Sequence, residues 1–87
     1  MHAVVVTVTI KDREAADEHL RNVVVPRVSQ SPGFVAGYWT RKDNTGLSMI
    51  VYESEDAAKA VTERIPEMVP ESVTLDGVDV REVAVSA

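Results

Sequence analysis

Four side chains of this 87-residue sequence could act on a small organic molecule: Trp39, Arg41, Tyr52 and His19. Trp39 is the only tryptophan, and its ring offers a flat surface on which an aromatic ligand can stack. Arg41 can stabilise an oxyanion, and a tyrosine hydroxyl can donate a hydrogen bond to a ligand oxygen. His19 can act as a general base near neutral pH. The set is suited to binding and deprotonating an aromatic molecule.

Each of these side chains also has an ordinary structural explanation. Aromatic residues in strands more often pack than act, so Trp39 could fill the interior of a dimer. Arg41 could be a solvated strand end, and Tyr52 a half-buried ring with its hydroxyl in water. His19 lies at the edge of a helical apolar stripe, where a histidine usually faces solvent. Because Tyr38 and Trp39 point to opposite faces of a strand, Trp39 pairs more naturally with Arg41.

The pattern of the chain predicts the elements that must position these side chains. Apolar and β-branched residues alternate over residues 2–10, 35–42 and 47–53, as expected for strands. Asp12 is a plausible N-cap for a first helix that ends near residues 22–25, before Pro26, or continues past a kink toward residue 29. The sequence thus predicts a strand, a helix and then a hairpin of two strands.

A second helix and a last strand complete the pattern. Ser54 is an N-cap, and apolar residues then recur at helical spacing until the helix stops close to Pro66. We expect residues 66–70 to be a connector, Asp76-Gly77 to be a turn, and residues 78–85 to form the final strand. No linker divides the chain, so residues 1–87 are expected to form a single domain.

The order of elements predicts an α+β fold of the ferredoxin-like βαββαβ type, with both helices on one face of a four-stranded antiparallel sheet. The other sheet face is then bare. Neither face is polar, because the strands carry apolar residues such as Tyr38, Leu47 and Met49, so the uncovered face must also be apolar. A large exposed apolar face is unusual in a monomer, so we expect a homodimer formed by sheet-to-sheet packing.

Composition and charge exclude several classes of partner. The net charge of −5 opposes contact with nucleic acid and with anionic membranes. No apolar run is long enough to span a bilayer, and no amino-terminal targeting signal is present. Without cysteine and with only two histidines, a metal site is not expected. We interpret the chain as a cytoplasmic protein that binds neither nucleic acid nor membrane.

Several short motifs give the chain a family resemblance. These motifs are Val25-Pro26-Arg27, Ser31-Pro32-Gly33-Phe34, Gly37-Tyr38-Trp39 and Tyr52-Glu53-Ser54. With the order of elements, they resemble the antibiotic-biosynthesis monooxygenase family of dimeric α+β barrels over nearly the whole chain. The resemblance implies a cavity in each subunit with a tryptophan in its wall. Some members oxidise polycyclic phenols with oxygen and no cofactor, and close relatives degrade haem.

The resemblance supports one function and leaves another open. Haem-degrading members pair their tryptophan with an asparagine on the first strand, whereas this chain offers Thr7 and Thr9 there. We therefore expect a small dimeric monooxygenase that needs no cofactor and binds an aromatic or polycyclic molecule beside the sheet. The alternative is a noncatalytic small-molecule-binding or regulatory module. RNA binding ranks last, because the strand over residues 46–52 lacks paired aromatic residues.

Overall fold

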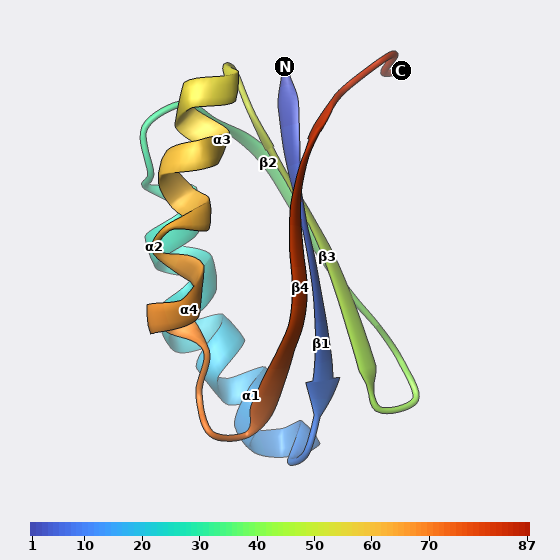
Figure 1. Ribbon diagram of the computed structural model, residues 1–87. Coiled ribbons are helices and arrows are strands. Elements are labelled where there is room, and N and C mark those ends of the chain that lie inside the picture. The colour runs from blue at the N-terminus through green and yellow to red at the C-terminus, as the bar shows by residue number, and fades with distance from the viewer.

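A four-stranded antiparallel sheet with helices on one face makes up the computed structural model, which describes residues 1–87 (Figure 1). The strands lie in the order β2-β3-β1-β4. The elements in chain order are β1 (His2–Ile10), α1 (Arg13–His19), η1 (Leu20–Val24), α2 (Val25–Ser29), β2 (Phe34–Lys42), β3 (Thr45–Tyr52), α3 (Glu55–Thr62), α4 (Ile65–Met68) and β4 (Val73–Glu82). The predicted ferredoxin-like fold is confirmed. No helix has the length and apolar character needed to cross a membrane.

The first helical segment runs through Pro26 instead of ending before it. Asp12 caps α1 by accepting a hydrogen bond from the Ala15 backbone N–H at 3.1 Å. The η1 segment is a π-helix, in which the Val25 N–H donates to the Leu20 carbonyl. Pro26 stands in the first turn of α2, where a missing N–H is tolerated. An ending near residues 22–25 is therefore wrong, and the continuation to Ser29 is confirmed.

Three expectations for the last third of the chain are wrong, and one of them is the position of the final strand, which runs over Val73–Glu82 and not over residues 78–85. Residues 66–70 were expected to be a connector, but Pro66 occupies the first turn of α4, a position that suits proline. Asp76-Gly77 is not a turn, because β4 continues through it with a register shift opposite Thr7 and Val8. Thr9 Oγ1 donates to Asp76 Oδ2 at 2.6 Å across this bulge. Pairing with β1 thus overrides the local turn signal.

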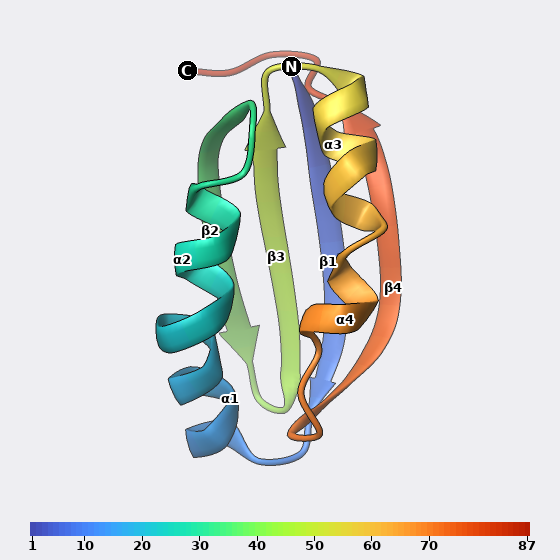
Figure 2. The same cartoon turned by 90° about the vertical axis from the view of Figure 1, so that its left-hand side faces the viewer.

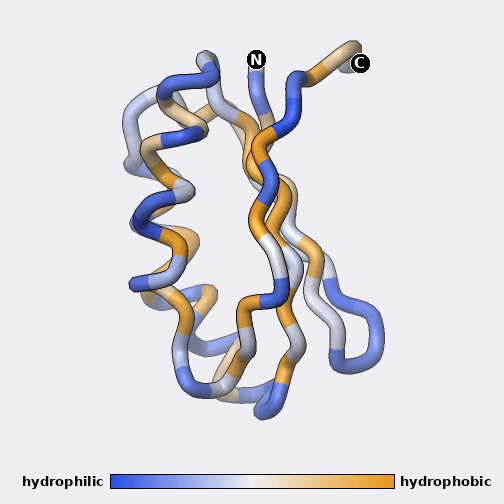
Figure 3. The backbone as a smooth tube through the Cα atoms, viewed as in Figure 1, coloured by the Kyte–Doolittle hydropathy of each residue, from blue (hydrophilic) through white to orange (hydrophobic).

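The two faces of the sheet have different surroundings. Apolar residues alternate along the strands, and the helices cover one face (Figure 3). On that face Val4, Ile50 and Tyr52 are almost completely buried. The opposite face is open, with Tyr38 66% and Met49 43% exposed. The strand register thus creates a packed interior on one side and an uncovered apolar surface on the other.

Tyr52 is a core residue with a constrained hydroxyl. Its side chain is fully buried, and its ring meets Phe34 edge to face at a centroid distance of 6.2 Å. Its hydroxyl lies 2.8 Å from Ser31 Oγ, and Ser31 donates its own proton to the Val28 carbonyl. The Tyr52 hydroxyl therefore donates to Ser31. Burial raises the pKa of Tyr52 above its usual value of 10.0, although the Ser31 hydroxyl, which can turn and donate to a phenolate, and nearby Arg64 oppose this rise.

The raised pKa of Tyr52 predicts a loss of stability in alkali. The folded protein holds the Tyr52 proton to higher pH than the unfolded chain does, so the stabilisation is complete below pH 10.0 and disappears as pH rises through the folded pKa. Tyr52→Phe should cost about 1 kcal/mol at neutral pH, because one hydrogen bond is lost. Its unfolding temperature should then fall less steeply in alkali than that of the wild type. Tyr38→Phe is the control, and equal alkaline slopes for wild type and Tyr52→Phe would contradict the prediction.

Candidate functional site

A cavity of about 520 Å³ lies between the helical layer and the sheet. The α1-η1-α2 segment and the α3-α4 segment run side by side over the same sheet face (Figure 2). The cavity takes most of its lining from α1, η1, α4 and the three strands β1, β2 and β3. Its lining is mainly hydrophobic, and the apolar residues of the sheet wall are Val6, Val8, Ile10, Trp39, Ile50 and Val73. An apolar cavity of this size is typical of small-molecule sites.

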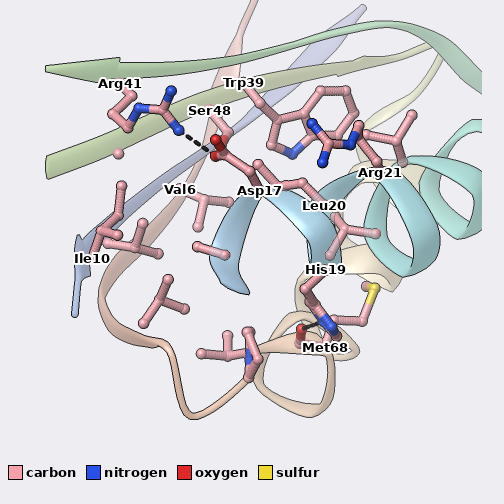
Figure 4. A pocket seen from close by; sticks show the side chains of 18 of the residues that line it. Val6, Ile10, Asp17, His19, Leu20, Arg21, Trp39, Arg41, Ser48 and Met68 are labelled. Carbon is pink, nitrogen blue, oxygen red and sulfur yellow. Dashed lines mark hydrogen bonds and ion pairs between the residues drawn. The ribbon is translucent and has the colours of Figure 1, made fainter. Parts of the chain in front are cut away.

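Trp39 lines this cavity from β2 (Figure 4). It pairs with Ser48 of β3, on the face that the helices cover, and it packs against the hydrophobic core. The ring lies close over Gly37, where a Cβ atom would come within 2.8 Å of the indole. A glycine at position 37 therefore leaves room for the ring. The interpretation that Trp39 fills a sheet-to-sheet dimer interior is wrong, because the ring faces the helices.

Arg41 lies on the same face as Trp39, as the alternation of β2 predicts. Its guanidinium forms an ion pair with the Asp17 carboxylate of α1, and both residues line the cavity (Figure 4). The two side chains keep 29% and 31% of their surface exposed, so the ion pair lies at the boundary between cavity and solvent. A pair with this exposure adds little stability, and its main effect is to join β2 to α1 at the cavity edge.

His19 also lines the cavity and joins the two helical segments. Its Nε2 atom lies 2.8 Å from the Met68 carbonyl oxygen of α4 (Figure 4). Since a carbonyl only accepts, Nε2 carries the proton, and in the neutral ring Nδ1 is left with a lone pair. His19 is half-buried, so the expectation of a solvent-facing histidine is wrong. The histidine is held in one tautomer beside the cavity.

Tyr52 is not part of this site. Its ring does not line the cavity, and its hydroxyl is bonded to Ser31 instead of facing water. The structure thus brings together Trp39, Arg41 and His19 and leaves the fourth candidate in the core. No three His, Asp or Glu side chains are gathered as they would be around a metal ion.

Polar residues that the sequence analysis did not assign to the site also line the cavity. Arg13 does so from the start of α1. Asp17 and Arg21 do so from the helical segment, and Ser48 does so from β3 (Figure 4). The four-residue spacing of Arg13, Asp17 and Arg21 was a signal that they share a helix face. Ser48 lies on the same face of β3 as Gly46 and Ile50, so the alternation of this strand was a signal that a hydroxyl group faces the cavity.

The fold and the cavity define a small ferredoxin-like α+β protein with a ligand-sized space between helices and sheet. No protein-family model matches the sequence, and no curated protein matches it. Solved structures do share the fold. SnoaB from Streptomyces nogalater, a cofactor-independent oxygenase crystallised as a mutant, superposes with a TM-score of 0.74 at 18% identity, over 98% of this chain and 94% of SnoaB.

Two further structures have the same fold at lower similarity. A candidate antibiotic biosynthesis monooxygenase from Deinococcus radiodurans has a TM-score of 0.61 at 16% identity, covering 100% of this chain and 96% of that one. The haem-degrader MhuD from Mycobacterium tuberculosis, with two haems bound, has a TM-score of 0.53 at 18% identity, covering 97% and 98%. The resemblance to antibiotic-biosynthesis monooxygenases is confirmed at the level of the fold.

Proposed function

We propose that this protein binds a planar aromatic or polycyclic small molecule in the cavity. The observation that carries the proposal is the cavity of about 520 Å³ with apolar walls and Trp39 in the sheet wall. This volume lies within the range of about 300–1,000 Å³ that is usual for small-molecule sites. The indole offers a face for ring stacking, and polar groups are confined to a few positions.

We further propose that the bound molecule is oxidised by oxygen without a cofactor. A lone pair on His19 Nδ1 can take a proton from an activated CH₂ group, and Arg41 can stabilise the resulting phenolate or enolate. Oxygen then reacts with the carbanion, and loss of water leaves a carbonyl, so one oxygen atom enters the product and the other leaves as water. The fold shared with SnoaB, a cofactor-independent oxygenase, supports this reaction class.

A noncatalytic binding module is the second candidate. One specific observation favours it: the two groups in the cavity that could act as bases each have a protein partner, which leaves only the Nδ1 lone pair of His19 to accept a proton. Asp17 pairs with Arg41, and His19 is bonded to the Met68 carbonyl through Nε2. If neither group reaches the ligand, the protein binds and releases it unchanged.

Ligand titration monitored by tryptophan fluorescence tests both candidates. Because Trp39 is the only tryptophan, we expect saturable quenching by polycyclic phenols such as anthrones at micromolar concentration, and none by aliphatic compounds of similar size. Oxygen uptake with a quenching anthrone would identify the oxygenase. Oxygen uptake no faster than in a protein-free control, with the anthrone recovered unchanged, would identify the binding module. Absence of quenching by every aromatic compound would contradict both.

We also propose that two copies of the chain associate through their open sheet faces. Four large apolar residues of β2 and β3 support this, with exposed fractions of 47% for Val35, 66% for Tyr38, 44% for Leu47 and 43% for Met49. A second copy would remove this surface from water. The cavity lies on the other side of the sheet, so each copy keeps its own. The cytoplasmic location stays a prediction from composition.

A further inference from the structure

Arginines are concentrated around the cavity. The chain has six arginines, and three of them, Arg13, Arg21 and Arg41, line the cavity, whereas Asp17 is the only acidic residue that does so. The formal charge of the lining is thus positive in a chain whose net charge is −5. This local reversal of sign marks the cavity as the part of the molecule that attracts anions.

The single acid of the lining is already neutralised. Asp17 forms its ion pair with Arg41, which crosses from β2 to the helical segment. Neither Arg13 nor Arg21 has a carboxylate within 4.0 Å, as the only ion pairs are those of His2, Arg41, Lys59 and Arg81. The two arginines stand four residues before and four residues after Asp17, so they flank the pair along the helical segment. Both positive charges are left without a protein partner.

Neither arginine has an evident structural role where it stands. Arg13 is the first residue of α1, where a positive charge opposes the helix dipole, and Arg21 belongs to the π-helical η1 segment and is exposed. π-helical segments interrupt regular helices, and they often occur at functional sites. This segment contributes Leu20, Arg21 and Val24 to the lining. It therefore supplies both apolar surface and charge to the same space.

We infer that the ligand is an anion: an aromatic body that lies against Trp39, with a carboxylate that the positive charges of Arg13 and Arg21 hold at the helical edge of the cavity. The inference rests on the proposed function and adds the charge of the ligand. An arginine guanidinium can bind a carboxylate through two parallel hydrogen bonds. Apolar walls hold the rings, and the charged edge fixes which end of the molecule faces the helices.

Binding of an anthracene carboxylic acid and of its uncharged primary amide tests the inference. Both probes have the same rings, and quenching of Trp39 gives both affinities. We expect the acid to bind about tenfold more tightly than the amide at low salt, and this preference to shrink as salt is added. Arg13→Gln combined with Arg21→Gln should bring the affinity of the acid down to that of the amide.

Arg27→Gln is the matched control, because Arg27 is an exposed arginine on α2 that does not line the cavity. It should keep the full preference for the acid. Equal binding of acid and amide to the wild type, or a preference that survives the double substitution, would overturn the inference and leave the proposed aromatic site standing. If neither probe quenches Trp39, both the inference and the proposed aromatic site fail. Circular dichroism of the double variant separates loss of the charges from loss of the fold.

Discussion

Trp39→Leu is expected to weaken binding of a polycyclic ligand by about ten- to a hundredfold and to remove oxygen uptake with it. Leucine keeps part of the contact with the core, but it removes the aromatic face. Aromatic pairs are worth about 0.5–1.5 kcal/mol beyond the area they bury, and the lost ligand contact area adds to this. The affinity is measured from the absorbance of the ligand, since the variant has no tryptophan. Trp39→Phe should retain an intermediate affinity.

The matched control for this prediction is Tyr38→Phe. Tyr38 is the neighbour of Trp39 in β2, but it lies on the open face and is 66% exposed. Its substitution should leave ligand affinity and oxygen uptake as in the wild type. Thermal unfolding of each variant shows whether the assay was made on folded protein. Full affinity in a folded Trp39→Leu would place the ligand elsewhere and would refute the proposed stacking role.

Met49→Asp is expected to convert the proposed homodimer completely into monomers at micromolar concentration. Met49 pairs with Tyr38 on one side and Val5 on the other, so it stands in the middle of the open face. Fully burying a methionine contributes about 1.5–3 kcal/mol, and a carboxylate there would lose its hydration on association. Both effects act in two copies, because each subunit of a twofold dimer contributes the same residue.

Sedimentation equilibrium measures the outcome directly. The wild type should sediment at twice the chain mass of 9.5 kDa, and the variant at 9.5 kDa. Val85→Asp introduces the same charge at a residue that follows β4 and is 90% exposed, so it should remain dimeric. A wild type that sediments as a monomer would end the dimer proposal, whereas a Met49→Asp variant that stays dimeric would move the interface to another surface.

The order and type of the elements could be predicted because they depend on local patterns. Alternation marked β1 with its observed bounds, and the caps at Asp12 and Ser54 marked the starts of helices. The two errors at Pro26 and at Asp76-Gly77 arose where a local signal did not decide the structure. Pro26 and Asp76-Gly77 are local signals that an element ends, but the π-helical segment η1 and a β-bulge accommodate them within longer elements. Pairing with β1 overrode the turn signal at Asp76-Gly77, and Pro26 stands in the first turn of α2, where its missing N–H is tolerated.

For the candidate site, the alternation of residues along a strand predicted which sheet face each side chain lies on. It did not predict which of the residues on that face reach the cavity. Alternation placed Trp39 and Arg41 on one face, and the structure confirms that placement. Tyr52 lies on that face too, but at the opposite end of its strand, beside Ser31. Arg13 and Arg21 line the cavity because of how the helical segment crosses the sheet, and that angle is set by packing, which no local pattern specifies.

The alternation of β2 has a consequence for how such a protein can diverge. Tyr38 belongs to the surface proposed for self-association, and Trp39, its neighbour in sequence, belongs to the cavity. If the proposed dimer forms, a single strand serves two unrelated purposes at alternate positions. Selection for a new ligand can change one set of positions while the other set is retained. In a lineage of such proteins, quaternary structure and ligand preference can therefore evolve independently of each other.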